Sequence, residues 1–177
     1  MIFLVKTNHI GYTEEEKKRE CLMVVTYEGA TGQVRQIVHH HAVLRRGVER
    51  RAGALCEAAQ TGVPFQRQLA TLRDYLEKEI LPHAKAEERI FYRAAATQAR
   101  GSDLVRALTA EHHALAYLAG RLAPGTDGHT AATVAEWIAT LFAGHVAKEN
   151  DLLLPALTSC GADLAVLLAD MHEPQAG

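Results

Sequence analysis

Residues 65–90 read FQRQLATLRDYLEKEILPHAKAEERI and repeat apolar side chains at intervals of three and four residues. This spacing places them on one face of an α-helix and predicts a helix over about 65–99, with that face in a protein core. The stripe consists of Phe65, Leu69, Leu72, Leu76, Ile80, His83, Glu87 and Ile90. The core-facing side of this helix therefore carries an imidazole and a carboxylate among its apolar residues.

The same pair of residue types occurs a second time. HAKAE at 83–87 is matched by HVAKE at 145–149, and in both the histidine precedes the glutamate by four residues. Residues at this spacing leave one face of a helix one turn apart. An unpartnered ionisable group in an apolar stripe would cost several kcal/mol. A transition metal is the partner that best holds imidazoles and carboxylates together inside a helical core.

Three further segments show the helical period. The first, over about 33–59, has an apolar face formed by Ile37, His41, Leu44, Val48 and Leu55. The third follows a break at residues 101–103 and ends at Pro124-Gly125, with a face formed by Leu104, Leu108, His112, Leu115 and Leu122. The fourth has an inward face formed by Val134, Ile138, Leu141, His145, Glu149 and Leu152. We predict an all-α fold, an antiparallel up-down four-helix bundle with a short C-terminal capping helix over about 162–171.

We predict the following organisation of the chain: an N-terminal tail over 1–30, the bundle over 31–160, and a C-terminal helix and tail over 161–177. The run EEEKKRE at 14–20 lies just upstream of Met23 and back-translates to a purine-rich stretch, as a ribosome-binding site would. Either translation starts at Met23 or the segment is a solvated tail. Pro82 also leaves two alternatives, a break between two shorter helices or a kink that aims His83 inward.

The composition limits the class of protein. Of the 177 residues, 48% are hydrophobic and 23% charged, which is typical of one globular domain. The net charge of −2 gives no electrostatic case for nucleic acid or an acidic membrane as partner. The three cysteines, Cys21, Cys56 and Cys160, lie far apart without CxxC spacing, which favours a reducing, cytoplasmic compartment over a disulfide framework.

One His–Glu pair alone is weak support for a metal site, because roughly one is expected by chance in a chain with this many histidines and glutamates. The joint pattern is more specific, since each helix has one inward histidine. His41 continues the first stripe better than His40, which stays an alternative. Glu88, His113 and Tyr117 either complete a metal shell or are solvated neighbours. We expect Glu111 to be solvated, and three histidines outside the stripes to lie at the surface: His9, His129 and His172.

Four motifs together resemble the hemerythrin/HHE cation-binding domain. They are HAVLR at 41–45, HAKAEERIF at 83–91, EHHAL at 111–115 and HVAKENDLLLP at 145–155, and the resemblance covers roughly residues 33–158. It implies a four-helix bundle that holds two non-haem iron ions in a bridged di-iron centre. The implied ligands are His41, His83, Glu87, His112, His145 and Glu149, with the two glutamates bridging the irons.

Two features separate this chain from the oxygen-carrying hemerythrins. Those proteins place another histidine four residues after the one on the third helix, where this chain has Ala116. They also have a five-residue His-to-Asp spacing on the last helix, where His145 and Glu149 are four apart. The chain is thus similar to the bacterial HHE type. The implied ligand count, about five per iron with a solvent bridge, leaves a position free for an exchangeable ligand.

We consider three classes of function, the first two of which the resemblance implies. The first is a protein that binds or senses a small diatomic ligand, O2 or NO. The second is an enzyme, a catalase- or peroxidase-like di-iron oxidoreductase that scavenges peroxide, or alternatively an iron-homeostasis protein. A third, metal-free interaction bundle would need six buried polar groups to satisfy one another, which is costly. The small ligand or peroxide is the expected partner, with neither nucleic acid nor membrane.

Overall fold

The computed structural model describes the backbone of residues 14–97 and 101–172 and the side chains of 32–97 and 101–169. Within these ranges all regular structure is helical and there is no strand, which confirms the all-α prediction. The side chains of Cys21, Met23 and His172, and the whole of His9, lie outside what the structure describes. The described part contains no helix that is both long and apolar enough to cross a membrane.

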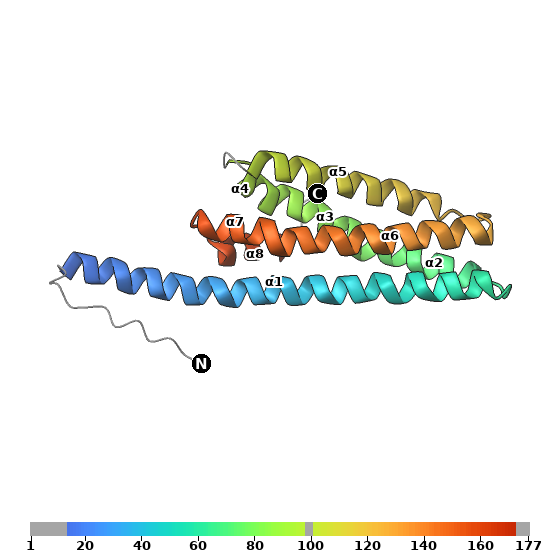
Figure 1. The fold of residues 1–177 in the computed structure, drawn as a ribbon, viewed down its shortest axis with the longest axis horizontal. Helices are drawn as coiled ribbons and strands as arrows, with labels where there is room; N and C mark the ends of the chain where they lie inside the picture. Colours follow the sequence, from blue (N-terminus) through green and yellow to red (C-terminus); the bar gives the residue numbers. More distant parts are fainter. Residues whose placement is uncertain (1–13, 98–100, 173–177) are drawn as a thin grey trace.

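Four long helical runs lie side by side (Figure 1). The first is α1 (Glu14–Gln60), which packs along α2 and α6. The second run consists of α2 (Gln66–Tyr75), η1 (Leu76–Ile80), α3 (Leu81–Glu87), η2 (Glu88–Tyr92) and α4 (Arg93–Ala96). The third is α5 (Gly101–Arg121), which packs on α4 and α6. The fourth consists of α6 (Gly128–Lys148), η3 (Glu149–Leu153) and α7 (Leu154–Ser159). The short α8 (Leu164–His172) follows and packs on α1 and η2.

Helix α1 extends further toward the N-terminus than the sequence predicts. We expected it to begin near residue 33, where the apolar stripe begins, but it begins at Glu14. Residues 14–20 are Glu, Lys and Arg, which have high intrinsic helix propensity and need no apolar face to stay helical. The apolar period therefore marks only part of the length of α1.

The elements η1, η2 and η3 are π-helical turns, and they correct two predictions. The helical backbone continues from η1 through Pro82 into α3, so the alternative of two separate helices is wrong. In η3 the extra residue of a π turn rotates the side chains that follow it. Leu152, predicted to face inward, is 51% exposed, and Leu153 and Leu154 are buried in its place.

The buried apolar residues form two clusters with a polar layer between them. On α1, Ile37 belongs to one cluster and Leu44 to the other, and His41 lies between them. On α5, His112 lies between Leu108 and Leu115 in the same way. The other two runs repeat this order around their His–Glu pairs. The fold therefore brings the ionisable residues of all four runs to one level of the core.

Candidate metal centre

All six residues predicted to be metal ligands lie together in this layer. Two overlapping groups have potential ligand atoms within 4.8 Å of one another, and both include Glu87. One group adds His112, His145 and Glu149 to it, and the other adds His41 and His83. The side chain of His83 is 10% exposed, and those of the other five residues at most 4%.

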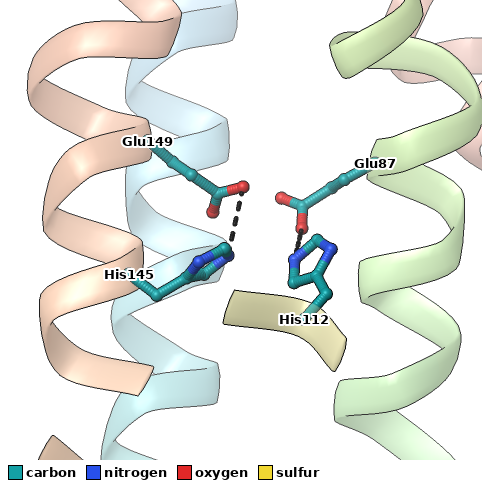
Figure 2. A group of neighbouring side chains, drawn as sticks. All are labelled: Glu87, His112, His145 and Glu149. Atoms are coloured by element: carbon teal, nitrogen blue, oxygen red, sulfur yellow. Dashed lines mark ion pairs between the residues drawn. The ribbon is translucent and has the colours of Figure 1, made fainter. Parts of the chain in front are cut away.

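Glu87 extends from α3 into the middle of the layer and contacts histidines on both sides. Its Oε1 lies 3.1 Å from Nε2 of His41 and 3.1 Å from Nε2 of His83. Its Oε2 lies 3.7 Å from Nε2 of His112 (Figure 2). One carboxylate thus presents one oxygen to each group of histidines.

Glu149, at the start of η3, does the same from the opposite side of the layer. Its Oε1 lies 3.4 Å from Nε2 of His145, and its Oε2 lies 3.8 Å from Nε2 of His41. Figure 2 shows the carboxylates of Glu87 and Glu149 facing each other, with His145 next to Glu149 and His112 next to Glu87. The two glutamates therefore lie between a pair of histidines on α1 and α3 and a pair on α5 and α6.

Three of the histidines are oriented by an acceptor on their other nitrogen. Nδ1 of His112 lies 2.8 Å from Glu88 Oε1, and Nδ1 of His145 lies 3.0 Å from Glu111 Oε2. Because a carboxylate only accepts, each of these Nδ1 atoms carries a proton. Nδ1 of His41 lies 2.8 Å from the side-chain oxygen of Asn150. In all three cases the Nε2 atom faces the centre of the layer.

This donor set fits a metal ion. Histidines that bind metals commonly donate their second ring nitrogen to a carboxylate or carbonyl, which fixes the ring and makes the ligating nitrogen more basic. The Nε2 of His83 is buried and makes no hydrogen bond within the described part of the chain, although Glu87 lies close to it. A buried nitrogen without a hydrogen bond is costly, and a metal ion at this point would use its lone pair.

The contacts within the cluster shift the pKa values of its ionisable groups. Burial alone would lower the pKa values of His41 and His145, but the carboxylates that they contact outweigh burial and raise both. Burial would likewise raise the pKa of Glu87, but His83 and His41 hold it well below its usual range. His112 differs, because burial and then the charge of His145 lower its pKa. Metal binding would therefore displace protons from this layer.

Tyr92 is a residue of this layer that the sequence analysis missed. Its side chain is buried, and its hydroxyl donates to Glu149 Oε1 at 2.6 Å. The Tyr92 hydroxyl oxygen also lies 3.3 Å from Nε2 of His112 and 3.5 Å from Nε2 of His145. Tyr92 follows Glu87 by five residues, which is the spacing of the π turn η2, so a search at the ordinary helical spacing of four stops at Phe91.

The remaining candidate residues lie in different surroundings. His41 is buried in the layer, whereas His40 is exposed and packs edge-on against His83 at 5.0 Å. His113 and Tyr117 are exposed and contact none of the cluster.

The carboxylate expected to be solvated proves to be a partner of the cluster. Glu111 is 21% exposed and holds His145, and Lys148 pairs with it, so the prediction of a merely solvated Glu111 is wrong. Its position one residue before His112 gave no sign of a contact with His145 on another helix. Asn150, too, was missed, because its partner His41 is 109 residues away in sequence.

Comparison with known proteins agrees with this geometry. The family model for the hemerythrin HHE cation-binding domain matches residues 33–157. The chain belongs to this family. The confirmed resemblance and the His/Glu cluster together support a cation-binding, hemerythrin-like domain. No curated protein and no solved structure matches the chain significantly. The position of the carriers' additional histidine, Ala116, is exposed in this hemerythrin-like domain and does not face the cluster.

Proposed function

We propose that this hemerythrin-like domain holds a bridged di-iron centre and binds or senses a small diatomic ligand, O2 or NO. The observation that carries the proposal is the placement of the two glutamates. Glu87 and Glu149 each present one oxygen to the His41 side of the layer and the other to the opposite side. Two carboxylates so placed can each bridge two metal ions.

The ligand set suits iron. His41 and His83 would hold one ion, His112 and His145 the other, and each bridging carboxylate would give each ion one oxygen. Imidazole and carboxylate ligands together suit iron among several transition metals. Four protein ligands per ion fall short of an octahedral shell, which leaves room for solvent and for an exchangeable ligand. Bound ferrous iron would supply the electrons that take up O2 reversibly.

The protein's own residues would shape that chemistry. The three Nδ1 acceptors hold the imidazole rings in one orientation. The two apolar clusters on either side of the layer limit the access of water, which would otherwise compete with the ligand for its position. Five of the six residues of the layer are almost fully buried, so the ligand should be small.

Metal analysis tests the centre directly. Protein purified aerobically after iron-supplemented expression should contain about two irons per chain and absorb in the near ultraviolet. Zinc at an equivalent amount, or no metal, would overturn the di-iron proposal. The reduced protein, kept free of oxygen, should then show a spectral change on exposure to O2 or NO that reverses when the gas is removed.

One observation favours a second function, a di-iron oxidoreductase that scavenges peroxide. The buried hydroxyl of Tyr92 lies between Glu149 and two histidines and could donate a hydrogen bond to a bound substrate. Sustained peroxide turnover by the iron-loaded protein would favour this function, and a single stoichiometric reaction would favour binding or sensing. No feature of the layer favours iron homeostasis over either.

Three further predictions belong with this proposal. We propose that the four runs form an antiparallel up-down bundle capped by α8, as the short connections between them support. We also propose a reducing, cytoplasmic location, which is supported by Cys56 and Cys160 being free thiols. We expect neither nucleic acid nor membrane as a partner.

A further inference from the structure

A groove lined by arginines lies between α1 and α2, apart from the metal centre. It consists of two adjoining pockets of about 650 and 280 Å3 that share Arg50 and Arg51. Arg46 lines the larger pocket and Arg67 the smaller one. The larger pocket also contains one carboxylate, Glu49, which pairs with Arg45. None of the six residues of the candidate metal centre lines either pocket. We refer to these two pockets together as the arginine groove.

Three of these cations have no acidic partner within the described residues. Arg46, Arg50 and Arg67 make no ion pair there, whereas neighbouring arginines do. Arg45, for example, pairs with Glu49 at 3.1 Å. Arg46 and Arg50 are also one helical turn apart, where like charges destabilise a helix. In a chain with a net charge of −2, this local excess of positive charge is a cost that a bound anion would offset.

The fourth cation is fixed in place before any ligand arrives. The Arg51 guanidinium lies over the ring of Tyr75, 3.9 Å from its centroid, and donates to the carbonyl of Gly47 at 2.9 Å. Gly47 allows this arrangement, because a Cβ there would lie 2.2 Å from the Tyr75 hydroxyl oxygen. The hydroxyl in turn donates to the Leu44 carbonyl at 3.4 Å. A guanidinium ordered in advance loses less entropy when it binds an anion.

The smaller pocket also contains an unsatisfied acceptor. Oε1 of Gln68 is buried and has no hydrogen-bond donor in the described part of the chain. Gln68 lines this pocket together with Thr71 and Arg67. A buried acceptor without a donor is costly, so an anionic ligand that also carries a hydroxyl group would be favoured here.

We propose that the arginine groove binds a small phosphorylated metabolite with at least two negative charges and a hydroxyl group. An arginine guanidinium can donate two parallel hydrogen bonds to two oxygens of one phosphate group. Because the cations are spread over two adjoining pockets, they suit an anion with more than one charged group. Each pocket is of the size that holds a small molecule or part of one. The overall negative charge of the chain disfavours a long nucleic acid as the occupant.

Calorimetric titration of the iron-loaded protein with inorganic triphosphate and with ATP tests this site. The wild type should bind one equivalent of each. The double substitution Arg50→Gln and Arg67→Gln should weaken the binding of both compounds by at least about tenfold, because charge-assisted hydrogen bonds are lost. The matched control is Arg93→Gln with Arg106→Gln, which removes the same charge from α4 and α5. It should bind as the wild type does.

Further variants separate the contributions. Gln68→Ala should weaken the binding of ATP, which carries ribose hydroxyls, and leave the affinity for inorganic triphosphate unchanged. Circular dichroism and iron content should match the wild type in every variant, and Arg67→Gln alone serves if the double variant does not fold. The proposal is overturned if the wild type binds neither compound, if the groove and control variants weaken binding equally, or if a single-stranded oligonucleotide binds more tightly than ATP. An equal effect of Gln68→Ala on both compounds would overturn the hydroxyl contact.

Discussion

The hydroxyl of Tyr92 donates to Glu149 Oε1 at 2.6 Å and so joins two helical runs inside the core. Burial, and then the charges of Glu149 and Glu87, raise the pKa of Tyr92 far above its usual value. The phenol therefore keeps its proton at any working pH of the metal-free protein. It is a fixed donor to one of the two carboxylates proposed to bridge the metals.

Replacing Tyr92→Phe should remove this donor and keep the ring packing. A hydrogen bond to a charged group contributes about 1.5–3 kcal/mol, so the metal-free variant should melt roughly 3–10 °C lower than the metal-free wild type. Circular dichroism melting of chelator-treated protein measures this. Tyr117→Phe is the matched control, because Tyr117 is 65% exposed and its loss should change little. Equal melting temperatures for the Tyr92 variant and the wild type would contradict the role of the bond.

The two glutamates in the layer should both be needed to retain metal. Glu87→Ala or Glu149→Ala removes a ligand shared by the two metal positions, so iron content should fall from about two per chain to well below one. Glu79→Ala is the control, because Glu79 lies on an exposed face of η1. Elemental analysis of the purified variants gives the answer, and unchanged iron content would refute the bridging role.

The acceptors behind the histidines should set how tightly the metals are held. Glu88 and Glu111 are carboxylates, while Asn150 is a neutral amide behind His41. Glu111→Gln should weaken metal affinity by about 10–100-fold, because a neutral acceptor makes His145 less basic. Asn150→Asp should have the opposite effect on the His41 side. The rate of iron loss to a chelator measures both, and Glu136→Gln, on an exposed part of α6, is the control.

For Asn150→Asp the contrary result would be a faster loss of iron, which would mean that packing around His41 and not charge decides retention. For Glu111→Gln it would be a rate equal to that of the wild type. Lys148 pairs with Glu111 and partly offsets the effect of its negative charge on His145. Lys148→Met should therefore slow iron loss if the charge of Glu111 matters.

Stability should depend on pH in opposite ways with and without metal. A histidine whose pKa is raised in the folded state, as for His41 and His145, contributes stability that is present below its unfolded pKa of 6.5 and lost as pH rises through the folded value. Glu87, with a lowered pKa, contributes stability that is present above 4.5 and lost as pH falls. These groups therefore stabilise the metal-free protein most between pH 4.5 and 6.5.

Melting at about pH 6 and about pH 8 tests this difference. The metal-free protein should melt lower at the higher pH, because His41 and His145 lose their protons there. His112, whose pKa is lowered, acts in the opposite direction and reduces the difference. The iron-loaded protein should not melt lower at the higher pH, because metal competes with protons for the same nitrogens and binds better as they leave. The same slope in both forms would show that these histidines are not the groups that bind the metal.

The sequence predicted the helices and the six residues of the layer because both follow the ordinary helical period. His41 and His112 lie in the middle of unbroken apolar stripes, so their level in the core could be read directly. The residues that were missed or misplaced depend on π turns or on contacts between different helices. Tyr92 and Leu152 lie in π turns, where one extra residue shifts the face, and a period of 3.6 cannot register this. Glu111 and Asn150 act across helices, through contacts that no local spacing encodes.

The register after η3 can be tested with two neighbouring leucines. Leu153 is 1% exposed and Leu152 is 51% exposed, the reverse of what an uninterrupted helical stripe predicts for Leu152. Leu153→Ala should therefore destabilise the protein by about 2–5 kcal/mol, the usual cost of truncating a buried leucine. Leu152→Ala should change stability by less than about 0.5 kcal/mol, as exposed substitutions do. Urea denaturation measures both, and the same chemical change at adjacent positions makes each variant the control for the other. A larger loss at Leu152 would mean that α6 continues through Glu149 without the π turn, which would also turn Asn150 away from His41.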